Sequence, residues 1–203
     1  MAKRLSRTRL FKINTQGELQ TQTAGAGISD SIGSQTRFRT GQEILSEVTV
    51  DLANGTAACT SFATVGAAGQ GTHKAIGVSS STGTHANAQL ILINGTASAD
   101  DGQGIITSGE LICVEAPAGG EDNIGVWYAN NASGSGNDMI GGGNQLIAAE
   151  AKILGSEATF SNVDVNLDNK YIYLVSSGST AATYTAGKFV LRLYGYNVFS
   201  DVS

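Results

Sequence analysis

The sequence has almost no proline, few charged residues and no long apolar run, and these absences exclude several classes of protein. Pro117 is the only proline in 203 residues, and charged residues make up 14% of the chain. This is unlike a proline-rich linker or a charged disordered tail. No window approaches 18 consecutive apolar residues, and the basic start "MAKRLSRTRLFKIN" lacks the apolar stretch of a secretory signal. We therefore expect an ordered protein that is made in the cytoplasm, stays soluble and has no membrane partner.

Cysteine and histidine are equally scarce, since the chain holds only Cys59, Cys113, His73 and His85. The two cysteines have neither the number of a disulfide framework nor the spacing of a zinc site, so we predict two buried free thiols. Both histidines lie in segments rich in glycine and threonine, and no serine lies in a G-x-S-x-G turn. We therefore predict no catalytic residue, no cofactor and no metal, and we do not expect an enzyme.

Large side chains are few, and they gather near the end of the sequence. The chain has six Phe, six Tyr and one Trp beside 27 glycines, so any core must be thin. The stretch "KYIYLVSSGSTAATYTAGKFVLRLYGYN", residues 170–197, holds two apolar runs. We predict that these runs are core strands, with each large side chain contributing roughly 2 kcal/mol on burial. The residues predicted to form this core are Tyr171, Tyr173, Phe189, Leu191 and Leu193.

After residue 45 the sequence alternates short runs of Val, Ile, Leu and Tyr with clusters of turn residues. This pattern is typical of an all-β or mainly β fold, such as an antiparallel sandwich or barrel of jelly-roll-like type. Residues 15–35 are predicted to be an extended crossing segment. Residues 40–48 fit a strand better than a short helix, and the run beginning at Gln145 fits a helix and a strand equally well. The predicted strands are 46–52, 60–65, 74–79, 88–94, 104–107, 109–116, 123–129, 145–154, 158–166, 170–176 and 187–198.

Residues 74–94 and 170–197 share a lysine, an alternating strand, a Ser-Ser pair, a threonine-rich turn and a second strand. Lys74 corresponds to Lys170, and Ile76 corresponds to Ile172. The similarity suggests two related β units, about 45–118 and 119–203, although turn-rich sequence can produce such matches by chance. One domain and two domains both remain open for the body, residues 45–203.

Charge is divided unevenly along the chain. Residues 1–39 hold seven basic residues against two acidic ones, a balance of +5, whereas the other 164 hold five against fifteen, a balance of −10. We predict that residues 1–44 comprise an extended basic N-terminal arm and the crossing segment, ahead of an acidic body. The arm residues predicted to make contacts are Lys3, Arg4, Arg7, Arg9, Leu10, Phe11, Lys12 and Ile13.

Two kinds of partner could receive this arm. Basic residues could neutralise the phosphates of nucleic acid. The charge density is low, however, and apolar side chains lie between the basic ones, so nucleic acid is not expected. An acidic protein surface, such as the body of a neighbouring copy, fits the mixture of charged and apolar residues better.

Three stretches together resemble a known class of protein. The stretches "AIGVSSSTGTHANAQLILING", "GELICVEAP" and "YIYLVSSGSTAATYTAGKFVLRLYGY", within residues 74–198, resemble the β-rich virion structural proteins of tailed bacteriophages, particularly the phages of marine cyanobacteria. The resemblance implies assembly into a virion after synthesis in the cytoplasm of the bacterial host, and it implies no enzymatic activity. It does not extend to the basic arm.

Three functions follow from these observations. The first is a capsid decoration or cement protein, a homo-oligomer bound to the major capsid protein, with its arm threaded between subunits. The second is a structural component of the neck, tail or fibre. The third is a carbohydrate-binding module that uses Trp127, Tyr128 and acidic loop residues.

Overall fold

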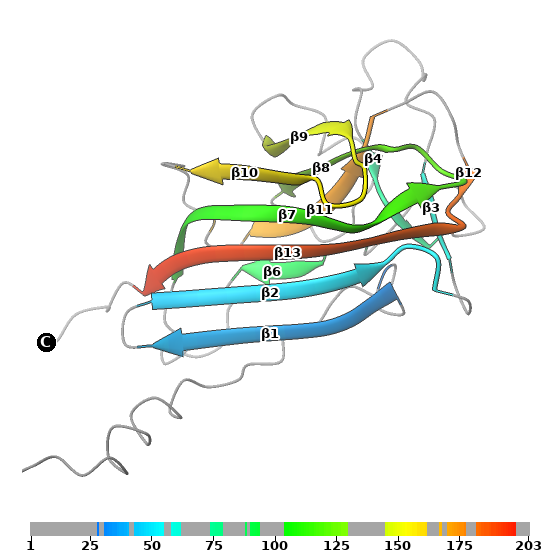
Figure 1. The fold of residues 1–203 in the computed structure, drawn as a ribbon. Helices are drawn as coiled ribbons and strands as arrows, with labels where there is room; N and C mark the ends of the chain where they lie inside the picture. The colour runs from blue at the N-terminus through cyan, green and yellow to red at the C-terminus, as the bar shows by residue number, and fades with distance from the viewer. Residues whose placement is uncertain are drawn as a thin grey trace, which may run out of the picture.

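The structure is a computed structural model, and it is built from antiparallel β-sheets (Figure 1). The prediction of a mainly β fold is confirmed, and no helix occurs among the described residues. The structure describes residues 28, 31–40, 43–54, 58–61, 74–78, 88, 90–93, 104–129, 145–161, 167, 170–177 and 182–197.

The first sheet has five strands in the order β1-β2-β13-β7-β10. The last strand of the described chain therefore lies at the centre of the sheet, between β2 and β7 (Figure 1). The strands β1 and β10 form the two edges. Their bounds are β1 Ile32–Thr40, β2 Glu43–Asp51, β13 Ala186–Asn197, β7 Gly104–Ala118 and β10 Glu157–Ser161.

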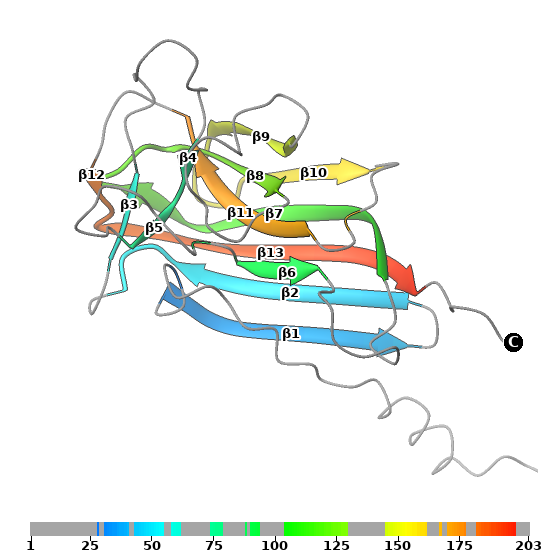
Figure 2. The same cartoon turned by 180° about the vertical axis from the view of Figure 1, so that it is seen from behind.

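The second sheet has the order β4-β11-β8-β9, and β6 also pairs with β11. Seen from behind, β6, β8 and β11 lie in front of the first sheet, so the two sheets form two layers (Figure 2). The bounds are β4 Lys74–Ala75, β11 Lys170–Ser176, β8 Asn123–Ala129, β9 Gln145–Ala151 and β6 Ile91–Ile93.

A small third sheet, in the order β12-β3-β5, lies at one end of these layers (Figure 1). Its strands are β12 Ala182–Thr183, β3 Cys59–Ser61 and β5 Gly77–Val78. Tyr184 is buried beside this sheet, where its hydroxyl donates a hydrogen bond to the Glu121 carbonyl oxygen at 2.8 Å. Burial raises the pKa of the Tyr184 hydroxyl well above its ordinary value.

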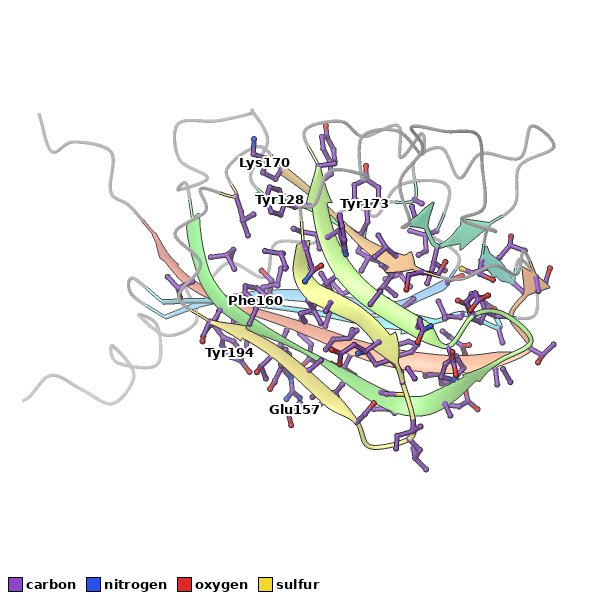
Figure 3. All side chains as sticks on the ribbon, turned by 90° about the horizontal axis from the view of Figure 1, so that it is seen from above. Tyr128, Glu157, Phe160, Lys170, Tyr173 and Tyr194 are labelled. Carbon is purple, nitrogen blue, oxygen red and sulfur yellow. The ribbon has the colours of Figure 1, made fainter. Side chains whose placement is uncertain are left out.

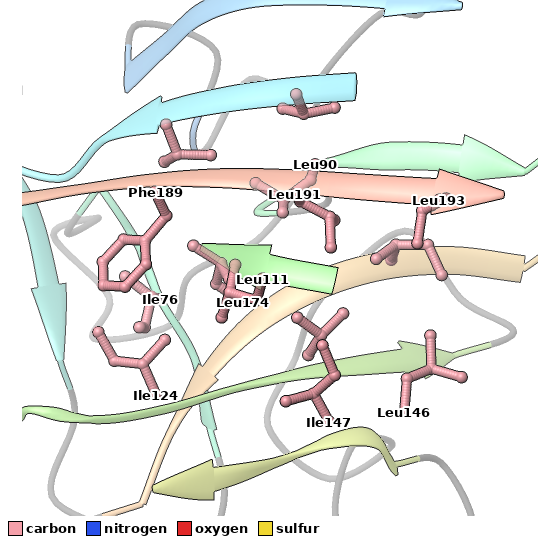
Figure 4. Packing of buried hydrophobic residues seen from close by; sticks show 14 of the residues in the cluster. Ile76, Leu90, Leu111, Ile124, Leu146, Ile147, Leu174, Phe189, Leu191 and Leu193 are labelled. Atoms are coloured by element: carbon pink, nitrogen blue, oxygen red, sulfur yellow. The ribbon is translucent and has the colours of Figure 1, made fainter. Parts of the chain in front are cut away.

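The main core lies between the first and second sheets (Figure 4). Alternation along β13 explains how the first sheet contributes to it, because successive side chains of a strand point to opposite faces. Phe189, Leu191 and Leu193 are at most 1% exposed, as predicted for core residues. The side chains that face them from the second sheet include Ile124, Val126, Leu146, Ile147, Ile172 and Leu174.

A second apolar cluster covers the opposite side of the second sheet. It contains Trp127, Tyr173 and Val175, with Tyr171 packed against it and partly buried. Figure 3 shows Tyr173 pointing away from the first sheet. Because β11 is buried on both faces, its sequence reads as the continuous apolar run "YIYLV" rather than as an alternation.

Most predicted strands are present, with several differences. The predicted strand 74–79 is divided into β4 and β5, which belong to different sheets, and β12 was not predicted. The strand β1 lies where an extended crossing segment and arm were predicted, so the prediction that strands begin after residue 45 is wrong. The ambiguous run at Gln145 is the strand β9 and not a helix. Residues 104–107 and 109–116 belong to one long strand, β7, and not to two.

The close contacts around Gly109 explain why the strand β7 continues through a glycine. A Cβ atom there would lie 2.5 Å from Cε1 of Phe160 and 2.6 Å from the carbonyl oxygen of Arg192. Phe160, on the edge strand β10, therefore packs its ring directly over the Gly109 backbone and points into the interior (Figure 3). The glycine serves close packing within the strand and does not mark a turn.

Strands from the two predicted halves are mixed in both large sheets. In the first sheet β2 and β7 of the first half flank β13 of the second, and in the second sheet β4 and β6 of the first half pair with β11 of the second. The described residues of the two halves therefore share one core. Whether the halves arose by duplication stays a prediction.

Replacing Phe189 with alanine should reduce the free energy of unfolding by about 3 to 5 kcal/mol, because it leaves a cavity between the sheets. Urea unfolding measures this change. Val190→Ala is the matched control, because this neighbouring side chain lies on the outer face of the same strand and is only partly buried. Equal midpoints for the two variants would show that Phe189 does not support the core.

Replacing Gly109 with alanine should also be destabilising, by about 1 to 3 kcal/mol, because the added methyl group overlaps both Phe160 and the β13 backbone. Gly33→Ala is the control. The Cβ added there meets mainly the Thr49 hydroxyl at 3.0 Å, a side-chain atom that can move. Thermal or urea unfolding that ranks the two variants in the opposite order would contradict the close packing at Gly109.

Candidate interaction surface

The residues predicted from sequence to make contacts divide into two groups. The arm residues Lys3, Arg4, Arg7, Arg9, Leu10, Phe11, Lys12 and Ile13 lie outside the described residues. The predicted core residues pack against both faces of the second sheet. Phe189, Leu191 and Leu193 lie in the main core, and Tyr173 lies in the second cluster on the other face.

The described residues hold no group of three or more His, Cys, Asp or Glu side chains that could bind a metal ion. The histidines at positions 73 and 85 lie outside the described part of the chain. Among the described residues, no helix is long and apolar enough to cross a membrane.

Both cysteines are free and buried, as predicted. The Cys59 thiol lies 3.1 Å from the Ser31 hydroxyl, and burial raises the pKa of this thiol to about 11. The Cys113 thiol donates to the Glu115 carbonyl oxygen at 3.3 Å, and burial also raises the pKa of Cys113. Since the thiolate is the nucleophile, neither cysteine is activated for chemistry at neutral pH.

The outer face of the first sheet carries a network of charged side chains across β2, β13 and β7. Arg192 donates from Nε to Glu47 at 2.7 Å and from Nη1 to Glu110 at 3.0 Å, because these two residues lie opposite it on the neighbouring strands. The Tyr194 hydroxyl donates to the same Glu110 carboxylate at 2.9 Å. Hydrogen bonds to Glu47 and Glu110 raise the pKa of Arg192, so its guanidinium stays charged.

Glu110 is held ionised by this network. Desolvation acts to raise the pKa of its carboxyl group, but hydrogen bonds from Tyr194 and Arg192 outweigh that effect and leave the pKa below its ordinary value. A second set of ion pairs lies further along β13, where Lys188 Nζ is 3.4 Å from Asp51 and 3.6 Å from Glu115. The Asp51 carboxylate, followed by that of Glu115, raises the pKa of Lys188.

We call this surface the acidic face, and define it by its charged residues. Among the residues whose side chains the structure describes, these are Glu47, Asp51, Glu110, Glu115 and Glu157, together with Arg192 and Lys188. Figure 3 shows Glu157 and Tyr194 on the outer side of the first sheet. Five carboxylates against two cations give these described residues a net charge of −3, so the ion pairs among them do not neutralise their charge.

An exposed apolar corner adjoins the acidic face. Ile153 and Leu154 are each 69% exposed in the turn between β9 and β10, and Val114 on β7 is 46% exposed. The turn is fixed against β7, because Gly155 N–H donates to the Cys113 carbonyl oxygen at 2.8 Å and Cys113 N–H donates to that of Ser156 at 2.9 Å. We call Val114, Ile153 and Leu154 the corner patch.

The conformation of the turn accounts for the exposure of the corner patch. Gly155 has a φ of 78°, which favours glycine, and the N–H of Ile153 donates to the Ser156 hydroxyl at 3.2 Å. Lys152, before the turn, is buried and its N–H donates to the Asp122 carbonyl oxygen at 3.0 Å. The backbone is thus anchored on both sides of two apolar side chains that point outward.

The sequence carries partial signals for this surface. Lys188, Arg192 and the alternating apolar residues of "KFVLRLY" indicate a strand with one charged face. The pairing of Arg192 with Glu47 and Glu110 cannot be read from sequence, because it depends on the register of three distant strands. Ile153 and Leu154 were assigned to a continuous strand or helix, which hid the turn.

Replacing Arg192 with methionine should raise the pKa of Glu110, because it removes a hydrogen bond and a positive charge. Since the folded-state pKa of Glu110 is depressed, its stabilising effect is complete above the unfolded pKa and is lost as pH falls through the folded pKa. The variant should therefore lose less stability than wild type between about pH 5 and pH 3. Carboxyl-carbon NMR titration and urea unfolding across this range measure the two effects.

Lys188→Met is the control for this experiment, because Lys188 pairs with Asp51 and Glu115 and not with Glu110. It should leave the pKa of Glu110 close to the wild-type value. The same Glu110 titration midpoint in wild type and both variants would contradict the network.

Comparison of the chain with protein-family models, curated proteins and solved structures gave no match.

Proposed function

We propose that the protein is a virion structural protein without enzymatic activity, most specifically a decoration or cement protein of a phage capsid. In this proposal the acidic β body sits on the head as a homo-oligomer after synthesis in the host cytoplasm. The arm, residues 1–13, ties it to neighbouring subunits and to the major capsid protein. The observation that carries the proposal is a rigidly held, exposed corner patch beside a charged sheet face.

Two features support a role in assembly rather than in catalysis. The described thiols are buried with raised pKa values, which leaves no activated nucleophile among them. Exposed apolar side chains on a rigid turn lower the free energy of a complex when a partner covers them, at about 25 cal/mol per Å² of apolar surface. The sequence resemblance to virion structural proteins of tailed phages points to the same class of function.

We also propose a finer description of the fold, in which the body is a jelly-roll-like sandwich of two related units behind an extended N-terminal arm. One contact supports the relationship between the units. The matched segments lie side by side, since Ala75 pairs with Val175 and Ile76 N–H donates to the Leu174 carbonyl oxygen at 2.9 Å. Their second strands differ in position, because β6 pairs with β11 whereas β13 belongs to the first sheet.

A neck, tail or fibre component is the alternative, because the same arm and patch could assemble a ring. Copy number distinguishes the two proposals. Decoration of a head requires on the order of hundreds of copies per particle, whereas a ring at the neck or tail has about a dozen, in keeping with its closed cyclic symmetry. Quantitative mass spectrometry of purified virions measures this number, and absence of the protein from virions would contradict both proposals.

A carbohydrate-binding module receives less support. Trp127, which would supply a stacking platform for a sugar ring, is 2% exposed and packs in the second cluster with Tyr173. Sugar stacking needs an exposed aromatic face, so this use of Trp127 would require the cluster to open.

Deleting residues 1–13 should leave the body folded, because the described strands begin at Ile32, but it should abolish attachment to virus particles. Reversing the charges of Lys3, Arg4, Arg7 and Arg9 should weaken attachment most at low salt, since ion pairs are screened over about 8 Å at physiological ionic strength. Replacing Leu10, Phe11 and Ile13 with serine should weaken it at every salt concentration. Cosedimentation with particles that lack the protein measures attachment.

Circular dichroism and thermal unfolding of each variant provide the control for folding. Full occupancy of particles by the truncated protein would refute the role of the arm as a tether. Binding of the isolated arm to DNA with the same affinity as to particles would place the arm in the particle interior and contradict attachment to the outer surface.

A further inference from the structure

We propose that the corner patch and the acidic face form the docking surface for the basic arm, residues 1–13, of a second copy of this chain. The inference rests on the assembly role proposed above and names the partner of the arm. Three observations support it: the apolar corner, the uncompensated charge beside it, and the length of chain that precedes the first described residue.

The apolar corner gives the arm a place to bury side chains. Val114, Ile153 and Leu154 are three of the four large apolar residues that are exposed in the described part of the chain, and the fourth, Tyr194, lies on the acidic face. The arm has apolar residues of its own, Leu5, Leu10, Phe11 and Ile13. Contact between these two sets would remove apolar surface from water on both partners.

The charges of the two partners are opposite. The arm has five basic residues and no acidic residue between Met1 and Ile13, and the acidic face has a net charge of −3. Glu157, on the edge strand, and Glu115, beside Val114, lie next to the corner patch in the strand register. A segment that alternates basic and apolar residues therefore matches a surface on which carboxylates adjoin apolar side chains.

The chain between the arm and the body is long enough to reach another molecule. Ile28 is fully buried, and its carbonyl oxygen accepts a hydrogen bond from Ser31 N–H at 2.9 Å, so the chain leaves the body at a fixed point. The 14 residues between Ile13 and Ile28 span at most roughly 50 Å when extended. Five strands about 4.8 Å apart make a sheet roughly 20 Å wide, so this linker can cross to a neighbouring copy.

Each copy has one arm and one docking surface, so the proposed contact is heterologous and can build a ring or a continuous network. A charge exchange between two variants tests it directly. The arm variant carries Glu in place of Lys3, Arg4, Arg7 and Arg9. The face variant carries Lys at three exposed positions of β10, Glu157, Thr159 and Ser161, which changes the charge of the face from −3 to +1.

Each variant alone should associate at least about tenfold more weakly than wild type in sedimentation velocity at low salt, because its arm and its face then carry charges of the same sign. An equimolar mixture should recover association, because the acidic arm of one variant meets the basic face of the other, and the basic arm of the second meets the acidic face of the first. If mixing the two variants does not recover association, the arm does not dock on the face of a second copy. That result would overturn the proposal.

A control adds positive charge away from the corner patch and the acidic face. Lys at Gln145, Thr183 and Thr185, which are exposed at the start of β9 and beside the third sheet, raises the net charge of the chain by 3 and should leave association close to wild type. Equal weakening by the control and the face variant would show an effect of net charge alone and would overturn the proposal.

A variant of the corner patch tests the apolar part independently of charge and of any folding defect in the Lys variants. Ile153→Ser with Leu154→Ser removes two exposed side chains and should weaken association at every salt concentration, with little change in thermal stability. Association equal to wild type would exclude the corner patch from the docking surface.

These results are separable from the test of virion function. If the mixture of variants stays monomeric while wild type is found in virions, the arm binds another virion protein, and only the present inference fails. If the mixture associates while virions lack the protein, the docking surface stands and the proposed virion function fails.

Discussion

The pairing of β13 between β2 and β7 is the interaction on which the rest of the structure depends. Both neighbours run antiparallel to it, and β2 and β7 do not pair with each other in the described sheet. Without β13 the first sheet would divide into the pair β1-β2 and the pair β7-β10. The same strand supplies Phe189, Leu191 and Leu193 to the main core, so sheet pairing and core packing rely on one segment.

Alternation along β13 also separates stability from recognition. Its inner side chains are buried, whereas its outer side chains, Lys188 and Arg192, form ion pairs that remain partly exposed to water. Exposed ion pairs contribute little to stability, with a median of about 0 to 1 kcal/mol. The outer face can therefore change in sequence or meet a partner at small cost to folding, while the inner face cannot.

Much of the fold could be predicted from sequence, and the exceptions have physical reasons. β8, β11 and β13 have dense apolar runs, and these predictions were confirmed. β1 was missed because "IGSQTRFRT" has few buried-type residues, and its position depends on pairing with β2. β7 was predicted as two strands with a break at Ser108, just before Gly109, where glycine allows the ring of Phe160 to pack closely. The acidic face depends on the register between strands far apart in sequence. The corner patch depends on a turn in a segment whose composition is typical of a helix.

The central place of β13 has a consequence during synthesis on the ribosome. Domains generally fold as units while chains grow at about 5 to 20 residues per second. Until residues 186–197 leave the ribosome, β2 and β7 lack their shared neighbour, and each keeps an unpaired row of backbone donors and acceptors. The partly made chain is then most vulnerable to joining strands with another nascent chain on the same messenger RNA. The abundance of small polar residues and the scarcity of large apolar ones in the earlier segments limit this hazard.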